Sequence, residues 1–364
     1  MLIAPRHLWR DGALHDAMAV EVEGGRVAAV APLAGRAPDA APHLLMPAPT
    51  DLQVNGGGGT MLNDDPTPDG IARIVAAHRA LGTGEILATL VTDHPEVMER
   101  ATEAALAARG LPGLLGLHLE GPHIAPDRRG VHDAARIRPL DRRTVDVAAR
   151  LCAAGLAVMV TLAPERAGPG LLAALVATGA VVSMGHSAAT AGEARAALAA
   201  GVRCVTHLFN AMPPMASREP GLLAAAILSD APCGLIADGH HVDWSMVRLA
   251  LAARPPGGRT FLVSDAMATV GGPDRFALYG RTIHLAGGRL VDADGRLAGA
   301  HLTMLGAMAN VHAHAGVPLA QAVAMATDWP RAAMGLPPHR VEPGTSLDRL
   351  VALDEALTLT ELPA

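Results

Sequence analysis

Short apolar runs alternate with amphipathic segments along most of the chain. Each run ends at a polar or turn residue, which is typical of a strand buried on both faces of a parallel sheet. The eight runs are residues 44–55, which prolines interrupt, 85–92, 114–120, 156–163, 180–186, 202–207, 233–238 and 260–265. Four of them end at residues that can hold a metal ion or move a proton: Glu120, His186, His207 and Asp265.

Segments with helical spacing and good helix formers separate these runs. They are residues 69–81, 95–108, 141–154, 169–178, 191–200, 222–228 and 244–253, followed by a last helical stretch after Thr303. Strict alternation of about eight strands with about eight helices predicts a (β/α)8 barrel of the TIM type. Such barrels build their active site at the C-terminal ends of the strands, where the four residues fall. A doubly wound open sheet is the alternative, but it would not easily unite strand ends so distant in sequence.

Residues outside the barrel are predicted to form a smaller unit from both chain ends. Residues 18–30 alternate in polarity around Gly24-Gly25, which predicts a hairpin, and residues 349–353 predict another short strand. We therefore expect a small β-sandwich domain from residues 1–47 and 336–364, and a barrel from residues 48–335. Residues 276–297 contain Gly287-Gly288 and predict a β-hairpin inserted after the eighth strand.

Composition favours a cytoplasmic enzyme. The 364 residues suffice for a barrel of about 250 residues and a smaller unit. The N-terminus has charges and a proline where a signal peptide needs an apolar core, and no apolar run is long enough to span a membrane. Three scattered cysteines suit a reducing cytosol, and a net charge of −6 without basic clusters argues against nucleic acid as a partner.

Lysine is absent from the sequence, so all 29 basic residues are arginines. This absence excludes a Schiff-base lysine, a Walker A lysine and a carbamylated-lysine metal bridge.

Three of the strand-end side chains form a candidate metal site. A catalytic zinc ion usually keeps about three protein ligands and one open position, and Glu120, His186 and His207 supply such a set. A single strand-end histidine is more often structural, so the prediction rests on the three together. Asp265 is expected to be the general base that deprotonates the attacking water and later protonates the leaving group. The alternatives for Asp265 are a helix cap or a fourth ligand.

Five short motifs surround these residues. They are His118-Leu119-Glu120-Gly121-Pro122, Gly185-His186-Ser187, Thr206-His207-Leu208-Phe209-Asn210-Ala211-Met212, Ala237-Asp238-Gly239 and Ser264-Asp265-Ala266. Together they resemble the N-acetylglucosamine-6-phosphate deacetylases of the amidohydrolase superfamily, from about Pro49 to Pro330. The resemblance implies a homodimer with one divalent metal ion per subunit, held by Glu120, His186 and His207, and Asp265 as acid and base. Zinc is the expected metal, with iron, manganese and cobalt as alternatives.

The resemblance also implies contacts with a small amino-sugar phosphate. His132 matches a residue that helps to polarise the acetyl carbonyl. The other implied substrate contacts are Val131 near the acetyl group, Asn210, Ala211, Arg218 and His241 around the sugar phosphate, and Leu297, Ala298 and Gly299 closing over the sugar. Arg218 makes independent sense because guanidinium binds phosphate bidentately, although it could simply pair with Glu219. The neighbouring subunit is expected to complete the phosphate site, with His241 as the candidate contact across the interface.

Two departures bear on the predicted chemistry. Many amidohydrolases carry His-x-His on the first strand for a second metal ion, whereas Gln53 and Asn55 stand here, so we expect a single metal ion. His240, where the family usually has an apolar residue, leaves the finer substrate preference open.

The expected activity is hydrolytic deacetylation of N-acetylglucosamine 6-phosphate. Alternatives are the galactosamine epimer as substrate, a deaminase or cyclic amidase activity, and a non-catalytic sugar-phosphate-binding scaffold.

Overall fold

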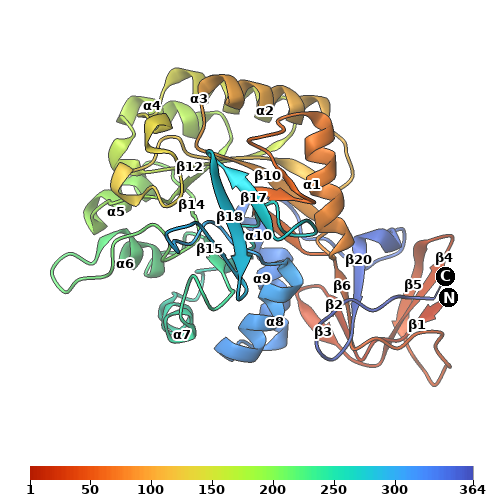
Figure 1. The fold of residues 1–364 in the computed structure, drawn as a ribbon. Coiled ribbons are helices and arrows are strands. Elements are labelled where there is room, and N and C mark those ends of the chain that lie inside the picture. The colour runs from red at the N-terminus through yellow and green to blue at the C-terminus, as the bar shows by residue number, and fades with distance from the viewer. Residues whose placement is uncertain (364) are drawn as a thin grey trace.

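The computed structural model describes residues 1–363, and its centre is an eight-stranded parallel sheet (Figure 1). The strands follow one another around the sheet in chain order: β7 (Thr50–Val54), β10 (Glu85–Val91), β11 (Leu114–Glu120), β12 (Ala157–Leu162), β13 (Val181–Met184), β14 (Cys204–Val205), β15 (Cys233–Ile236) and β16 (Thr260–Val263). A parallel bridge between Val54 and Ala266 joins the end of β7 to the segment after β16. The sheet is therefore a nearly closed barrel, which confirms the predicted TIM-type fold.

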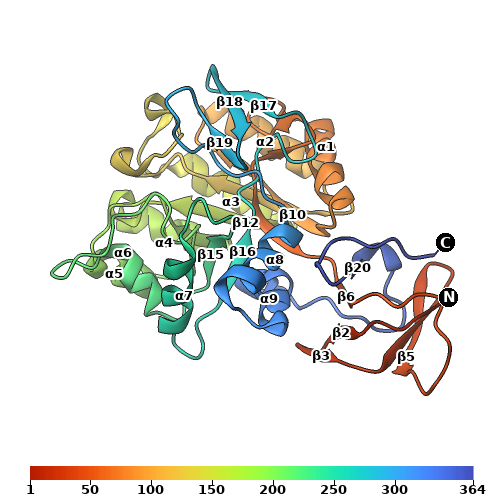
Figure 2. The same cartoon turned by 60° about the horizontal axis from the view of Figure 1, so that its bottom comes forward.

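Helices cover the outside of this barrel (Figures 1 and 2). They are α1 (Pro68–Ala80), α2 (Pro95–Ala107), α3 (Arg142–Ala153), α4 (Pro169–Ala177), α5 (Ala191–Ala199), α6 (Gly221–Ile227), α7 (Trp244–Ala253), α8 (Met304–Ala315), α9 (Leu319–Ala326) and α10 (Asp328–Ala333). The first seven match the predicted ranges within one residue at each end. Local signals explain this agreement, because Thr67, Asp141 and Thr190 each cap a helix by accepting a backbone N–H, and Thr190 forms a capping box with Glu193.

Both chain ends contribute to two small antiparallel or mixed sheets beside the barrel (Figure 2). One contains β1 (Leu2–Ile3), β4 (Met18–Glu23) and β5 (Arg26–Pro32); the other contains β2 (His7–Arg10), β3 (Ala13–His15), β6 (Leu44–Pro47) and β20 (Leu350–Leu353). They share a core that includes Ile3, Val20 and Leu45, as expected for a small sandwich. These strands support the limits that we propose for the small domain, residues 1–47 and 336–364.

The prediction of one strand over residues 44–55 was wrong. β6 belongs to the small domain, where Leu45 pairs with Ala352, whereas β7 belongs to the barrel and pairs with β10. Pro47 and Pro49 flank the change of sheet, and a proline cannot donate a backbone hydrogen bond to continue a ladder. The prolines therefore divide the run between two structural units.

The inserted segment is a three-stranded antiparallel sheet instead of the predicted hairpin. Its strands are β17 (Arg275–Leu278), β18 (Arg281–Ala286) and β19 (Arg289–Val291). Apolar side chains of this sheet, such as Leu278 and Leu290, pack with Val91 and Met267 beside the C-terminal ends of the barrel strands. The insertion therefore covers part of that end of the barrel. A short β8 (Gly56–Gly57) and β9 (Thr60–Met61) form a separate hairpin next to it.

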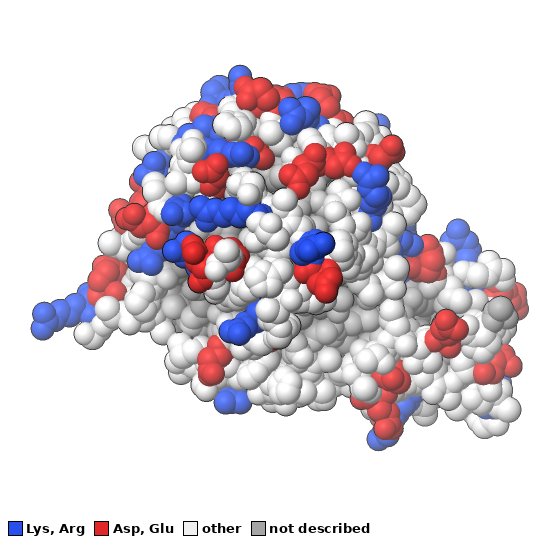
Figure 3. All heavy atoms as spheres, viewed as in Figure 1, with Lys and Arg blue, Asp and Glu red and all other residues white. Residues whose placement is uncertain are grey.

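The surface carries both signs of charge in close mixture, as Figure 3 shows for one face. Such mixing differs from the basic stripe of a nucleic-acid-binding protein. No helix within residues 1–363 is both long enough and apolar enough to cross a lipid bilayer.

Asp51 is a buried carboxylic acid inside the barrel, and burial raises its pKa to about 7. One of its oxygens accepts hydrogen bonds from the backbone N–H groups of Gln53 and Ser264, while the other has no partner among residues 1–363. The folded protein therefore holds this proton more tightly than the unfolded chain, whose pKa is 3.8. The resulting stabilisation is fully present below that pKa and is lost as pH rises through about 7.

We expect Asp51→Asn, which cannot ionise, to gain stability relative to wild type as pH rises. Between pH ~5 and pH ~8 the unfolding free energy of the variant should rise relative to wild type by up to about 3 kcal/mol. Each pH unit over which Asp51 is ionised in the unfolded chain but protonated in the folded one contributes ~1.4 kcal/mol. Urea unfolding of both proteins at the two pH values measures this difference. An equal free-energy difference at both pH values would show that folding does not raise the pKa of Asp51.

Candidate active site

A cavity of about 180 Å³ lies at the C-terminal ends of the barrel strands. Glu120 ends β11, His186 follows β13, His207 follows β14 and Asp265 follows β16, so four strands contribute to one site. The sequence-predicted residues that line the cavity are Glu120, Val131, His132, His186, His207, Asn210, Ala211, His241, Asp265, Leu297 and Gly299.

Two sequence-predicted residues do not line this cavity. Ala298 is buried in the apolar core of the insertion, although its sequence neighbours Leu297 and Gly299 line the cavity. Arg218 is exposed on the loop before α6, which projects from the barrel in Figure 1. Glu219, the alternative partner of Arg218, instead accepts hydrogen bonds from the backbone N–H groups of Ala191 and Gly221. The fold thus separates Arg218 from the other substrate candidates.

Glu120, His186 and His207 bring three potential ligand atoms together. Nε2 of His207 lies 3.0 Å from Oε1 of Glu120 and 3.0 Å from Nε2 of His186. Nε2 of His186 lies 3.3 Å from the same glutamate oxygen. Two ligand atoms on one tetrahedral zinc ion are about 3.3 Å apart, given bond lengths near 2.0–2.1 Å. The spacing of the three atoms therefore fits one divalent cation.

Charge at these three residues also fits a cation. Burial opposes ionisation of Glu120, but hydrogen bonds with His186 and His207 outweigh it and hold the pKa of Glu120 well below its ordinary value. Burial likewise disfavours a charged His207, yet the contact with Glu120 prevails and raises the pKa of His207. The buried carboxylate thus requires positive charge beside it, and a divalent metal ion can supply that charge in place of a proton.

His132 competes with His207 as the third ligand, since Glu120, His132 and His186 also offer ligand atoms within 4.8 Å of one another. Nδ1 of His132 lies 2.7 Å from the hydroxyl of Thr92 and 3.4 Å from its backbone nitrogen. Burial lowers the pKa of His132 to about 3, so the ring is neutral. Because a backbone N–H only donates, Nδ1 is the acceptor and the ring proton lies on Nε2, where it blocks metal binding. This hydrogen bonding favours His207.

The ring of His186 has the opposite arrangement. Its Nδ1 lies 2.8 Å from the carbonyl oxygen of Arg128, to which it donates. The proton on Nδ1 leaves the lone pair of Nε2 free, as a metal-ligating histidine requires.

Asp265 is held by two amide side chains. Its Oδ1 accepts hydrogen bonds from Nε2 of Gln53 at 3.0 Å and from Nδ2 of Asn55 at 2.7 Å. The Gln53 amide also donates to Oε1 of Glu120 at 2.7 Å, so it connects the two carboxylates. Burial, aided by the negative charge of Glu120, raises the pKa of Asp265 to about 6. A carboxyl group with this pKa can both take up and release a proton near neutral pH.

A buried hydrogen-bond network lies beneath the candidate metal ligands. His118 uses both ring nitrogens, one on the carbonyl of Leu52 at 2.9 Å and one on the hydroxyl of Thr161 at 2.7 Å. That hydroxyl continues to Thr206 and Ser183 at 2.7 and 2.6 Å. With both nitrogens occupied, His118 supports the strand ends and is not available as a further ligand, consistent with its lowered pKa of about 4, which burial causes.

The backbone is strained where three functional residues leave their strands. His186, His207 and Asp265 have φ values of 48°, 26° and 51°, a region that residues with a side chain rarely adopt. Such strain collects at active sites because the surrounding fold must hold each side chain in a fixed direction. Here it turns the three side chains from the strand direction toward a common point.

His241 lines the cavity of its own chain and is oriented by Asp238. Its Nδ1 lies 2.6 Å from Oδ2 of Asp238, and its backbone N–H donates to Oδ1 at 2.8 Å. Burial would raise the pKa of Asp238, but the hydrogen bonds from His241 prevail and lower it. His240 is exposed beside this residue, and its ring faces the Gly287-Gly288 turn of the insertion.

Sequence reasoning missed the functional positions of four residues. Gln53 and Asn55 were recognised as poor metal ligands, but not as the amides that hold Asp265. Thr92 fixes the ring of His132, and Tyr279 donates from its hydroxyl to the carbonyl of Thr92 at 2.5 Å. The Gln53-x-Asn55 spacing at a strand end was a usable signal, since both side chains face the barrel interior. Nothing in the sequence indicated the contact between Tyr279 and Thr92, which are distant in the chain.

Known proteins share this fold and these motifs. The Amidohydrolase family matches residues 44–354. An N-acetylgalactosamine-6-phosphate deacetylase from Shewanella sp. (strain ANA-3) is 38% identical, over 77% of this chain and 71% of its own. An N-acetylglucosamine-6-phosphate deacetylase from Haemophilus influenzae is 33% identical, over 79% of this chain and 76% of its own.

Solved structures agree with the sequence relatives. The crystal structure of N-acetylglucosamine-6-phosphate deacetylase from Pasteurella multocida superposes with a TM-score of 0.90 at 28% identity. That superposition covers 98% of this chain and 96% of the Pasteurella chain. With a matching domain, a matching barrel and relatives that align over most of their length, this chain belongs to the amidohydrolase family.

Proposed function

We propose that this protein hydrolyses the acetamide of N-acetylglucosamine 6-phosphate to glucosamine 6-phosphate and acetate. The observation that carries the proposal is the buried Glu120, His186 and His207 triangle beside a carboxyl group, Asp265, with a pKa near 6. The names of the Haemophilus and Pasteurella relatives support the choice of substrate.

In this proposal Glu120, His186 and His207 hold a single divalent metal ion. When bound, such an ion supplies Lewis-acid activation of water and of the amide carbonyl. Gln53 and Asn55 occupy the position that would complete a second site, and their amide nitrogens face carboxylates as donors. A donor group cannot ligate a cation through the same atom, which favours a mononuclear centre.

Asp265 performs both proton transfers. As a carboxylate it takes a proton from the attacking water, and as a carboxylic acid it delivers that proton to the departing amine nitrogen. Gln53 and Asn55 donate to Oδ1, which leaves Oδ2 for the proton. His132 donates from Nε2 to the acetyl oxygen as negative charge develops there, and its neutral ring keeps that proton available.

The sugar phosphate is proposed to contact Asn210, Ala211 and His241 at one end of the cavity, with Val131, Leu297 and Gly299 around the sugar. His241 lines the cavity of its own chain, so the structure supports a role there in preference to one across an interface. Arg218, exposed on a projecting loop, is the better candidate for a contact in a neighbouring subunit. A homodimer, zinc as the metal ion and a cytoplasmic location complete the proposal.

The galactosamine epimer is a second candidate substrate. The Shewanella relative, an N-acetylgalactosamine-6-phosphate deacetylase by name, is 38% identical to this chain, compared with 33% for the Haemophilus enzyme. The epimers share an acetamide and a phosphate, so the same metal ligands and Asp265 would serve both. Substrate preference then depends on the sugar-facing loops alone.

We expect metal-loaded protein to release acetate from N-acetylglucosamine 6-phosphate and not from unphosphorylated N-acetylglucosamine. Asp265→Asn should lower kcat on the order of 10²- to 10⁴-fold, because both proton transfers lose their carrier. An acetate-release assay with both 6-phosphate epimers measures activity and preference together. Wild-type metal content in the variant is the control for the fold. If neither epimer releases acetate although the metal ion is bound, the result would point to a deaminase, a cyclic amidase or a binding scaffold.

We expect His207→Gln to purify with little metal, because it removes a ligand from the triangle. His132→Gln should keep about one metal ion per chain and lose activity, because its Nε2 is a donor. Elemental analysis by mass spectrometry distinguishes the two, with His94→Gln, an exposed histidine away from the cavity, as the matched control. Metal loss in His132→Gln with retention in His207→Gln would reverse the assignment of the third ligand.

Tyr279 is a positioning residue, since it reaches His132 only through Thr92. Tyr279→Phe should lower kcat roughly 3- to 10-fold, as expected for loss of one hydrogen bond, with little change in KM. Steady-state kinetics together with Tm measures this, and Thr282→Val in the same insertion is the control. If the variant instead loses Tm and metal content and its kcat per bound metal ion is unchanged, Tyr279 only stabilises the fold.

A further inference from the structure

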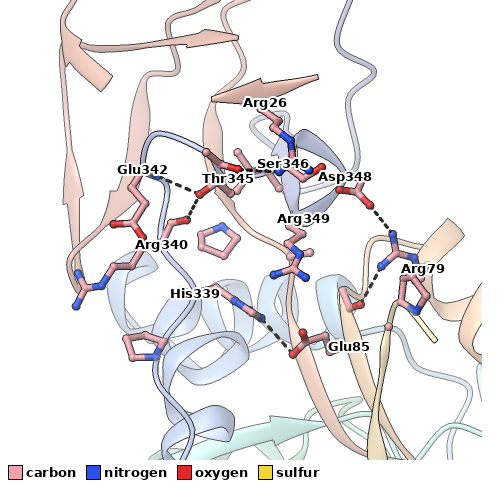
Figure 4. Close-up of a pocket in the computed structure, with 18 of the residues that line it drawn as sticks. Arg26, Arg79, Glu85, His339, Arg340, Glu342, Thr345, Ser346, Asp348 and Arg349 are labelled. Atoms are coloured by element: carbon pink, nitrogen blue, oxygen red, sulfur yellow. Dashed lines mark hydrogen bonds and ion pairs between the residues drawn. The ribbon is translucent and has the colours of Figure 1, made fainter. Parts of the chain in front are cut away.

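A second and larger cavity lies between the small domain and the barrel. Its volume is about 690 Å³, which suits a small organic ligand. Arg26 at the start of β5 and Arg349 before β20 approach from the terminal segments, while Arg79 of α1 and Glu85 of β10 approach from the barrel (Figure 4). Glu85 is the first residue of its strand, so this cavity lies at the end of the barrel opposite the candidate active site.

The carboxylates at this cavity are mostly neutralised by partners. Arg79 pairs with Asp348 at 3.1 Å. Glu85 pairs with Arg331 and with His339, and the pKa of Glu85 is lowered because its contacts with these two residues outweigh its burial. Figure 4 shows the His339–Glu85 and Arg79–Asp348 contacts on either side of the cavity.

Two guanidinium groups remain without a carboxylate partner. Within residues 1–363, neither Arg26 nor Arg349 lies within ion-pair distance of an acidic side chain, and Arg26 donates only to the carbonyl of Gly344 at 2.9 Å. The Arg349 side chain extends into the cavity between His339 and Arg79 in Figure 4. Glu342, exposed at the rim, is the remaining carboxylate among the lining residues. The cavity therefore has an excess of positive charge where the two domains meet.

Glycine positions keep this cavity in its present form. A Cβ atom on Gly113, whose φ is 97°, would lie 2.7 Å from the Cδ atom of Arg79. A Cβ atom on Gly84 would lie 2.7 Å from that of Ala48. A side chain at Gly113 would displace Arg79, and one at Gly84 would clash with Ala48, which also lines the cavity.

We propose that this interdomain cavity binds a small phosphate monoester, with Arg26 and Arg349 as its principal contacts. Guanidinium groups bind phosphate through paired N–H donors, and two of them from different parts of the chain match the charge of a phosphate monoester. The ligand bridges the terminal sheets and the barrel, and it stabilises their association. It takes no part in the chemistry at the opposite end of the barrel.

Thermal unfolding of the metal-loaded protein tests this site with glucose 6-phosphate, which carries no acetamide, and with glucose as the neutral probe. At about ten times Kd the phosphate ester should raise Tm by about 2 °C, and glucose should not. Arg349→Gln and Arg26→Gln should abolish the rise. Arg142→Gln, an exposed arginine of α3 that pairs with Asp146, should retain it. Glu342→Gln should enlarge the rise, because it removes a repelling charge.

His241→Asn separates this site from the candidate active site. The rise in Tm should persist in His241→Asn, and Arg349→Gln should keep kcat/KM for acetate release within about twofold of wild type. A rise that survives both arginine substitutions, or that disappears in His241→Asn, would overturn the proposal. No rise in the wild type at millimolar phosphate ester would overturn it as well, whatever the acetate assay shows.

Discussion

A buried carboxylate that must remain ionised governs the catalytic end of this barrel. Glu120 is 2% exposed, and taking such a charge out of water is costly unless positive charge lies against it. The imidazoles of His207 and His186 lie 3.0 and 3.3 Å from it, and the pKa of His207 is raised by this contact. The same requirement fixes the directions of the strand ends and explains why a cation belongs among them.

Hydrogen bonds hold the side chains around Glu120, and for most of these bonds the partner atoms determine which group donates and which accepts. The carbonyl of Arg128 sets the proton of His186, and the backbone N–H of Thr92 sets the proton of His132. Gln53 connects Glu120 to Asp265 through one amide nitrogen. Two histidines in one cavity thereby acquire different roles, one as a lone-pair donor and the other as a proton donor, without differing in residue type.

The candidate metal ligands and the candidate acid and base at the strand ends could be predicted from the sequence. Buried parallel strands are short apolar runs, and few polar residues stand at their ends. Glu120, His186, His207 and Asp265 lie together for this reason. Residues 44–55 were wrongly predicted as one barrel strand because hydrophobic periodicity does not show which sheet a strand joins. The pairing of Leu45 with Ala352 places the first part of this run in the small domain. Arg218 had the right chemistry for phosphate, yet loop position depends on tertiary packing, which local sequence does not encode. The tautomers of the histidines likewise depend on distant partners.

Closure of the small sandwich joins the two ends of the chain (Figure 1). Strand β6 needs β20 as a neighbour, and the partner of Leu45 is Ala352, about 300 residues later. During synthesis the edge of β6 therefore stays open until β20 has been made, long after the barrel strands have emerged. A chain whose translation stops before β20 can assemble much of the barrel but leaves this edge unpaired, so the pairing of β6 with β20 distinguishes a chain that has reached residue 353 from a shorter one.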